Sequence, residues 1–180
     1  MQRGKCTLDE IEKHLIENNI EGSFSSADME VIYNHVHNLL PGQVYLEIGV
    51  AAGKSLSTAF FSTCEGVFTI GIDYVDCTDG RRGAFFNLLT VSQIIYVQAD
   101  ANVFAKIWNY PIDVLFIDGA HDDMNVERDT LTWMPRVKSG GVILYHDYNQ
   151  GNAEGVKIFV DRYHKKFEVL NGNIAKVIKE

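Results

Sequence analysis

Five short apolar runs, separated by polar or helical stretches, constrain the fold of this chain more than any other feature of its sequence. The runs are apolar almost throughout, and they occupy residues 44–49, 67–73, 94–97, 113–118 and 142–146. Strands with this pattern are covered on both faces, as in a parallel sheet with helices on either side. Since crossovers between parallel strands are right-handed, the order predicts a doubly wound, mostly parallel α/β sheet.

The segments around these runs complete the predicted architecture. Helical periodicity and capping residues predict helices at residues 7–18, 26–40, 54–63, 84–89, 101–108, 123–134 and 153–166. The last two predicted strands, 167–170 and 174–178, flank a turn signal at 171–173. We therefore expect a C-terminal antiparallel hairpin at the edge of the sheet.

No linker and no change of composition divides the chain, and its length of 180 residues suits one domain. We predict a single domain over residues 1–180. It consists of an N-terminal helical extension at 1–41 and an α/β core at 42–180.

Charge and cysteine content restrict the partners and the compartment. The formal net charge of −8 argues against a nucleic-acid surface, and we interpret Arg81-Arg82 as part of a solvated loop. Three cysteines without a C-x-x-C pair favour a reducing compartment. The sequence shows no secretory signal and no apolar run of about 18 residues, so we expect a cytoplasmic protein with no membrane partner. The sequence leaves open whether the protein forms a homo-oligomer.

Ionisable residues stand at the ends of all five predicted parallel strands. In strand order they are Glu47, Asp73, Asp100, Asp118 and the pair His146-Asp147. Ligands of open parallel sheets bind beyond the carboxyl ends of the strands. Five such residues in register predict a binding site at this edge.

The loop after the first strand limits the choice of cofactor. A dinucleotide site needs G-x-G-x-x-G, but Ala51 and Lys54 stand where the second and third glycines belong. Gly53-Lys54-Ser55 matches the end of a P-loop, although the spacing from Gly49 is one residue too short. A P-loop that is one residue short would not form the concave set of backbone N–H groups that binds phosphate, so a phosphotransferase is the weaker alternative.

A third pattern, Glu47-x-Gly49-x-x-x-Gly53, fits the loop completely. Its two glycines let the backbone run close to a nucleoside and to an amino-acid tail. Asp73, at the end of the second strand, is placed to accept hydrogen bonds from ribose hydroxyls. Asp100 could accept a hydrogen bond from the amino group of an adenine.

With these motifs, the sequence resembles class I S-adenosylmethionine-dependent methyltransferases. Two further motifs, Phe-Ile-Asp-Gly-x-His at 116–121 and His-Asp-Tyr at 146–148, resemble a branch of small O-methyltransferases. The resemblance covers about residues 42–178. It implies a Rossmann-like fold, S-adenosylmethionine as cofactor, and a hydroxyl of a small molecule or sugar as acceptor. The cofactor-binding residues that it implies are Glu47, Gly49, Gly53, Ser55, Asp73, Tyr74, Asp100, Ala101 and Asp118.

Transfer to a hydroxyl requires that the acceptor lose a proton. His121 or His146 could take it as a general base, with Asp118 beside them. Alternatively, the resemblance implies a divalent cation such as magnesium, held by Asp118 and Asp147. His146 stands where relatives often carry another acid or amide, which favours the metal-free alternative.

Besides the phosphotransferase, one further alternative remains, a domain without enzymatic activity. A Rossmann-like domain of this size could bind the cofactor or a partner without catalysis. We interpret Asp129 and Trp133, on the helix at 123–134, as residues of packing and helix solubility.

Overall fold

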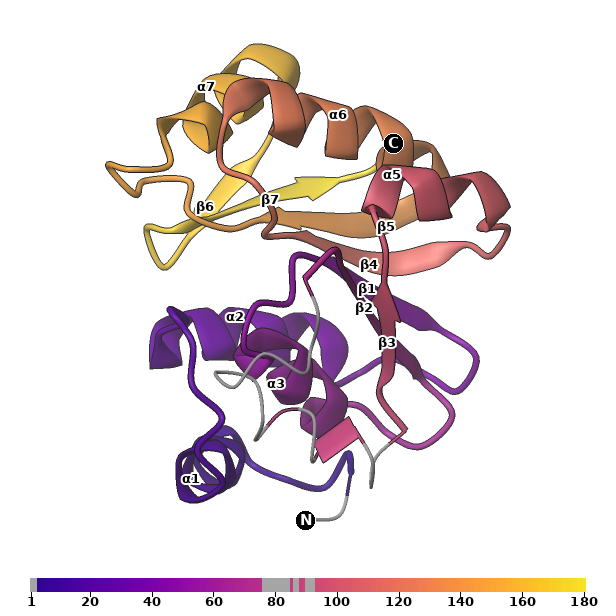
Figure 1. Cartoon of the computed structure of the whole chain (residues 1–180), viewed down its shortest axis with the longest axis vertical. Coiled ribbons are helices and arrows are strands. Elements are labelled where there is room, and N and C mark those ends of the chain that lie inside the picture. The colour runs from indigo at the N-terminus through magenta and orange to yellow at the C-terminus, as the bar shows by residue number, and fades with distance from the viewer. Residues whose placement is uncertain (1–2, 76–84, 86–87, 90–92) are drawn as a thin grey trace.

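Seven strands form one sheet in the computed structural model, which describes residues 3–75, 85, 88–89 and 93–180. The strands are β1 (Val44–Ile48), β2 (Phe68–Asp73), β3 (Ile95–Gln98), β4 (Ile112–Ile117), β5 (Val137–Tyr145), β6 (Glu168–Leu170) and β7 (Ile174–Ile178). Their order across the sheet is β3-β2-β1-β4-β5-β7-β6, with helices on both faces (Figure 1). Neighbouring strands from β3 to β5 are parallel, whereas β7 runs antiparallel to both β5 and β6. The predicted Rossmann-like sheet with a C-terminal hairpin is confirmed.

The helices follow the predicted order with small shifts at their ends. The described residues form α1 (Leu8–Glu17), α2 (Ser26–Val36), α3 (Lys54–Ser62), α5 (Ala101–Phe104), α6 (Asp123–Trp133) and α7 (Glu154–Tyr163), with 3₁₀ turns η2 (Ala105–Ile107) and η3 (Met134–Arg136). The helix predicted at 101–108 divides into α5 and η2. Three of the six residues of the helix predicted at 84–89 lie outside the described residues, as do Arg81-Arg82. No helix in the described part of the chain is long and apolar enough to cross a membrane.

Capping boxes begin both N-terminal helices. The Thr7 side chain accepts the N–H of Glu10, whose side chain in turn accepts the N–H of Thr7. Ser25 and Asp28 make the same reciprocal pair at the start of α2. Such a cap contributes about 1 kcal/mol, so the sequence sets where α1 and α2 begin.

The two helical layers enclose separate apolar cores, one on each face of the sheet (Figure 1). α1, α2 and α3 cover one face, where Leu15, Met29 and Leu56 are fully buried. α6 and α7 cover the other, where Trp133 and Phe159 are fully buried. Each such side chain contributes roughly 1.5–3 kcal/mol on burial, so both layers are fixed to the sheet.

β5 begins at Val137, five residues before the start predicted at 142. The end of β7 explains the extension, because it continues along the added residues. Gly140 donates its N–H to the carbonyl of Lys179 at 2.8 Å, and Lys179 donates to the carbonyl of Gly141 at 2.9 Å. The hairpin thus lengthens the strand that it pairs with.

The register of the parallel strands brings their carboxyl ends into one row. Ile48 of β1 pairs with Ile117 of β4, so the residues that follow them are neighbours as well. Gly49, Asp118 and His146 each donate a backbone N–H to the adjoining strand, at N···O distances of 2.9, 2.8 and 3.1 Å. The backbone is therefore ordered up to the residues that form the candidate site.

Candidate functional site

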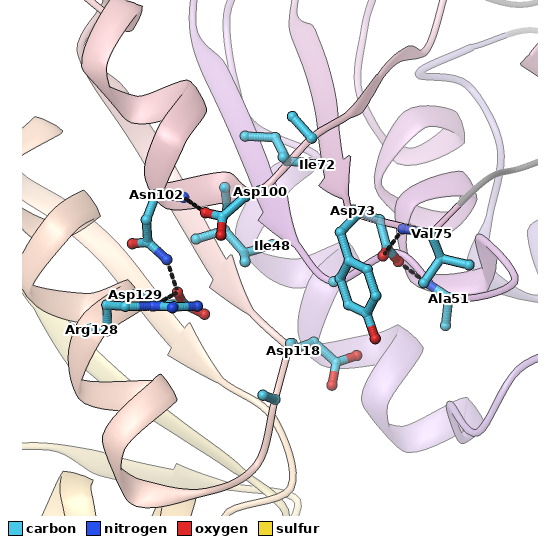
Figure 2. A pocket seen from close by; sticks show the side chains of 16 residues that line it. Ile48, Ala51, Ile72, Asp73, Val75, Asp100, Asn102, Asp118, Arg128 and Asp129 are labelled. Carbon is cyan, nitrogen blue, oxygen red and sulfur yellow. Dashed lines mark hydrogen bonds and ion pairs between the residues drawn. The ribbon is translucent and has the colours of Figure 1, made fainter.

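A cavity of about 310 Å³ opens beyond the carboxyl ends of β1, β2 and β3. Figure 2 shows its lining side chains, which come from these strand ends and from α5 and α6. Six of the predicted cofactor residues line it: Gly49, Asp73, Tyr74, Asp100, Ala101 and Asp118. The cavity lies at the edge of the sheet where the sequence predicts a ligand.

Gly49 lets the loop after β1 turn closely against the end of β4. Its φ of +84° lies in the left-handed region. A Cβ atom here would lie 2.1 Å from the carbonyl oxygen of Asp118, which no side chain could do without moving the backbone. The bare backbone at Gly49 consequently forms part of the cavity wall.

Asp73, at the end of β2, holds the same loop. Its Oδ2 accepts the N–H groups of Val50 and Ala51, both at 3.0 Å, and its Oδ1 accepts the N–H of Val75 at 3.0 Å. Figure 2 shows the bonds to Ala51 and Val75. These bonds fix the carboxylate at the wall of the cavity, between the loop after β1 and the end of β2. Contact with the ribose stays a prediction, and the structure adds a role in fixing the loop.

Three predicted cofactor residues lie behind the loop and do not line the cavity. Glu47 is fully buried, and its two oxygens accept the hydroxyls of Tyr45 and Ser55 at 2.6 Å each. Burial raises the pKa of Glu47 to about 8, against the opposing effect of both hydroxyl donors. A Cβ at Gly53 would lie 2.2 Å from the ring of Phe85. Glu47, Gly53 and Ser55 therefore support the loop from the interior.

The other predicted cofactor residues of the cavity are Tyr74 and the start of α5. Tyr74 is 80% exposed, so its ring is free to cover a ligand. Asp100 caps α5, accepting the N–H groups of Asn102 at 2.8 Å and Val103 at 3.1 Å. Like Asp73, Asp100 organises backbone beside the cavity.

Among the polar residues that line the cavity, sequence reasoning missed Asn102, Arg128 and Asp129. Asp129 is buried and accepts the amide of Asn102 at 2.6 Å (Figure 2). Burial raises the pKa of Asp129. The signal was present, since Asp129 lies between Val126 and Trp133 on the buried stripe of α6. The packing role predicted for Trp133 is confirmed, because this side chain is fully buried.

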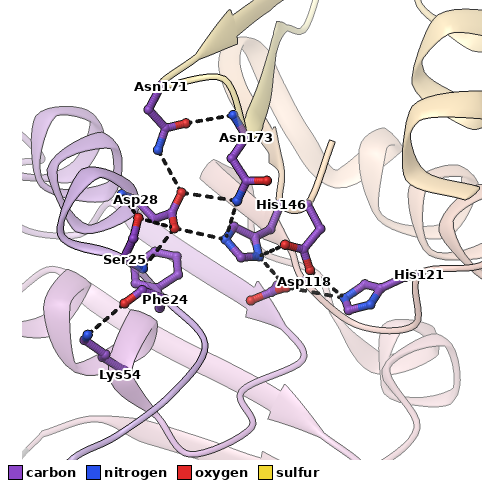
Figure 3. Close-up of polar contacts among 10 residues, drawn as sticks. Phe24, Ser25, Asp28, Lys54, Asp118, His121, His146, Asn171 and Asn173 are labelled. Carbon is purple, nitrogen blue, oxygen red and sulfur yellow. Dashed lines mark hydrogen bonds and ion pairs between the residues drawn. The ribbon is translucent and has the colours of Figure 1, made fainter. Parts of the chain in front are cut away.

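A second group of side chains meets at the ends of β4 and β5. The structure brings together Asp118, His121, His146 and Asp147, as predicted from the parallel register (Figure 3). Nδ1 of His146 lies 3.0 Å from Oδ1 of Asp118 and 3.2 Å from Oδ1 of Asp147. Nε2 of His121 lies 3.2 Å from Oδ2 of Asp147. We call these four residues the strand-end cluster.

His146 is the buried centre of the strand-end cluster. Burial opposes a positive charge on its ring, but hydrogen bonds to Asp118, Asp147 and Asp28 outweigh this effect and raise the pKa of His146 to about 12. A raised pKa favours the imidazolium form, which has no free lone pair to accept a proton. The general-base role of His146 stays a prediction, and this shift counts against it. Sequence reasoning did not find Asp28, whose Oδ2 lies 3.5 Å from Nε2.

His121 faces the open side of the strand-end cluster, with its side chain 38% exposed. Its Nε2 has no aligned hydrogen-bond partner among the described residues, although Asp147 and Asp118 lie 3.2 and 3.8 Å away. The carboxylate of Asp118, together with that of Asp147, raises the pKa of His121 despite partial burial. His121 is thus the more exposed histidine of the cluster, and its role as a general base stays a prediction.

Asp147 is held in a conformation unusual for its residue type. Its φ is +60°, in the left-handed region, which costs a non-glycine residue about 1 kcal/mol or more and is concentrated at functional sites. Asp118, His121 and Asp147 each offer one ligand atom, and these atoms all lie within 4.8 Å of one another. These three side chains are close enough to share a cation, and metal binding by Asp118 and Asp147 stays a prediction.

Comparisons with known proteins agree with this geometry. A family model described as a methyltransferase domain matches residues 46–148. The S-adenosylhomocysteine-bound methyltransferase PaMTH1 of Podospora anserina aligns over 94% of this chain and 87% of its own, with 14% identity and a TM-score of 0.72. The O-methyltransferase of Bacillus cereus, in complex with S-adenosylhomocysteine, aligns over 96% and 90%, with 16% identity and a TM-score of 0.66.

A third solved structure is MycE, a methyltransferase of the mycinamycin biosynthetic pathway, in complex with magnesium, S-adenosylhomocysteine and mycinamycin VI. It aligns over 97% of this chain and 55% of its own, with 18% identity and a TM-score of 0.62. At these identities the solved structures show the shared fold, while the family match spans more than half of the chain. The chain therefore belongs to the methyltransferase-domain family and is a class I S-adenosylmethionine-dependent methyltransferase.

Proposed function

We propose that this enzyme transfers the methyl group of S-adenosylmethionine to a hydroxyl oxygen of a small molecule. The observation that carries the proposal is the adjacency of the cavity and the strand-end cluster, which share Asp118. A cofactor in the cavity would present its methyl group near Asp118, beside the histidine that can take a proton. The O-methyltransferase of Bacillus cereus and the mycinamycin-bound MycE support this choice of acceptor.

Methyl transfer from a sulfonium is an in-line displacement at the methyl carbon. The acceptor oxygen bonds to this carbon while the carbon–sulfur bond breaks, and the electron pair stays on sulfur, which leaves S-adenosylhomocysteine. The hydroxyl proton passes to Nε2 of His121, because His146 already carries its proton. Asp118 and Asp147 stabilise the imidazolium that His121 becomes.

A divalent cation such as magnesium fits the same cluster. Asp118 and Asp147 would hold it, and their position beside the unpartnered Nε2 of His121 provides room for one. The cluster also places Asp28, Asp118 and Asp147 around the single imidazolium of His146, so an added positive charge is favourable there. When bound, the cation would lower the pKa of the acceptor hydroxyl.

The test is an acceptor screen with the purified protein, S-adenosylmethionine and a panel of sugars, phenols and other hydroxylated compounds. Release of S-adenosylhomocysteine and mass spectrometry of the product measure transfer. We expect an O-methylated product, a rate lowered by EDTA, and recovery of that rate with magnesium.

His121→Ala should lower the rate by roughly 100-fold or more, since it removes the proton acceptor. His37→Ala is the matched control, because His37 is an exposed histidine on the C-terminal side of α2. Tight binding of S-adenosylhomocysteine without transfer to any acceptor would contradict the proposal and favour a binding domain. A product methylated on nitrogen or carbon would contradict the assignment of the acceptor atom.

A further inference from the structure

Asp28 lies on α2, in the N-terminal helical segment that precedes the residues matched by the methyltransferase family model. Its side chain is buried and points toward the strand-end cluster (Figure 3). Oδ2 of Asp28 lies 3.5 Å from Nε2 of His146. Removing a carboxylate from water is costly unless charged or hydrogen-bonding partners compensate, so this placement demands specific partners.

Donors from two segments hold Asp28 in place. Oδ2 accepts the N–H and the hydroxyl of Ser25, at 2.9 and 2.6 Å. Oδ1 accepts the side-chain amides of Asn171 and Asn173, at 2.7 and 3.4 Å, from the turn between β6 and β7. Figure 3 shows Asp28 between this turn and the start of α2. These contacts leave the carboxylate one orientation, in which Oδ2 faces His146.

The ring of His146 links Asp28 to the reacting side of the cluster. Its Nε2 faces Asp28, and its Nδ1 faces Asp118 and Asp147. The Phe24 ring, also from the N-terminal segment, packs against it with ring centroids 5.3 Å apart. Because the two nitrogens of one ring have a fixed separation, holding Nε2 also fixes where Nδ1 points.

We propose that Asp28 is a positioning residue of the methyl-transfer site, acting through His146 on Asp118 and Asp147. The inference rests on the proposed function, which assigns these two carboxylates to the acceptor. Without Asp28, Nε2 keeps the Asn173 amide 3.2 Å away but loses its charged partner, so the ring is held less firmly and Nδ1 is less well placed to hold Asp118 and Asp147 together. The N-terminal helices thereby take part in the catalytic geometry, in addition to covering one face of the sheet.

The experiment compares Asp28→Ala and Asp28→Asn with the wild-type chain, using the acceptor found by the screen. We expect kcat to fall roughly 10- to 100-fold, as for residues that orient functional groups from behind. The dissociation constant for S-adenosylhomocysteine should stay within about twofold, because Asp28 does not line the cavity. Asp28→Glu, which keeps the charge, should recover part of kcat.

A second readout needs no acceptor. Diethylpyrocarbonate modification of His146, followed by mass spectrometry, should be slow in the wild-type chain, where this side chain is 3% exposed, and faster in Asp28→Ala. If no acceptor is methylated, the proposed function fails, and this readout still decides the role of Asp28. Continued protection of His146 in Asp28→Ala would overturn the inference.

Thr7→Ala is the matched control, since it removes the capping hydroxyl of α1, which pairs with Glu10 and not with Asp28. We expect a lower melting temperature with kcat and His146 protection close to wild type. If Thr7→Ala lowers kcat as much as Asp28→Ala does, the loss comes from loosening of the N-terminal helices and the inference is overturned.

Discussion

Two buried carboxyl groups, one behind each half of the site, have pKa values that are shifted in opposite directions. Glu47 lies behind the cofactor loop with the hydroxyls of Tyr45 and Ser55 as partners, and burial raises its pKa to about 8. Asp28 lies behind the strand-end cluster. Burial opposes its ionisation too, but its hydrogen bonds, led by that to His146, hold the pKa of Asp28 well below the ordinary value. The charge of the partner therefore decides which buried acid ionises.

This difference separates the two halves of the site by their chemistry. The cofactor cavity rests on a neutral interior, and the acids that line it, such as Asp73 and Asp100, accept backbone N–H groups. The strand-end cluster rests on fixed charges that surround one imidazolium. We infer that backbone geometry governs affinity for the cofactor, and that charge arrangement governs turnover.

Glu47→Gln tests the neutral interior behind the cofactor cavity. We expect the largest effect from this substitution. A raised pKa means that the folded state prefers protonated Glu47. The contribution of this residue to the free energy of unfolding is therefore complete below about pH 4.5 and is lost as the pH rises toward 8. Between pH 5 and 7 the free energy of unfolding of the wild-type chain should fall by about 3 kcal/mol relative to Glu47→Gln. Urea unfolding across this range measures it.

Glu65→Gln, at an exposed acid, is the control and should keep the wild-type pH dependence. If Glu47→Gln keeps the same slope as the wild-type chain, Glu47 is ionised in the folded state. The contrast between the two buried acids would then disappear.

Asp118→Asn and Asp147→Asn test whether turnover and cofactor affinity separate. Both variants should lower kcat by roughly 10- to 100-fold, because each removes a charge from the strand-end cluster. Asp118 also lines the cavity and Asp147 does not, so only Asp118→Asn should weaken S-adenosylhomocysteine binding, by roughly 1–3 kcal/mol. Equal losses of affinity in both variants, measured by calorimetry, would show that the halves are not separable.

We expect Asp73→Ala to have a smaller effect, and only on the affinity for the cofactor. The truncation removes an acceptor for the ligand and frees the N–H groups of Val50 and Ala51, which costs roughly 1–2 kcal/mol of cofactor affinity. Calorimetry with S-adenosylhomocysteine checks this, and circular dichroism confirms that the variant folds. An unchanged dissociation constant in a folded variant would remove Asp73 from the cofactor site.

The sequence predicts the cofactor half better than the cluster because the signals of the first are local. Gly49 and Asp73 follow their strands directly, and the parallel register then aligns them without further information. Glu47 and Ser55 were expected at the cofactor, but their side chains bond to each other in the interior. A spacing pattern specifies where the loop turns, and not which side chains face inward.

The strand-end cluster depends on contacts between distant segments. The meeting of Asp118 with His146 follows from neighbouring strands and is predictable from their order. The contact of Asp28 with His146 depends on how the N-terminal helices dock on the sheet and on the turn that carries Asn171. Without that contact the raised pKa of His146 could not be anticipated, and this shift counts against the predicted role of His146 as a base.

The most direct measurement of the central claim is calorimetric titration of the purified protein with S-adenosylhomocysteine, ATP and NAD. We predict binding of S-adenosylhomocysteine at a single site and no binding of the two phosphorylated ligands. Gly49→Val should abolish this binding, since any side chain there would strike the carbonyl of Asp118. Binding of ATP or NAD together with no binding of S-adenosylhomocysteine would contradict the account.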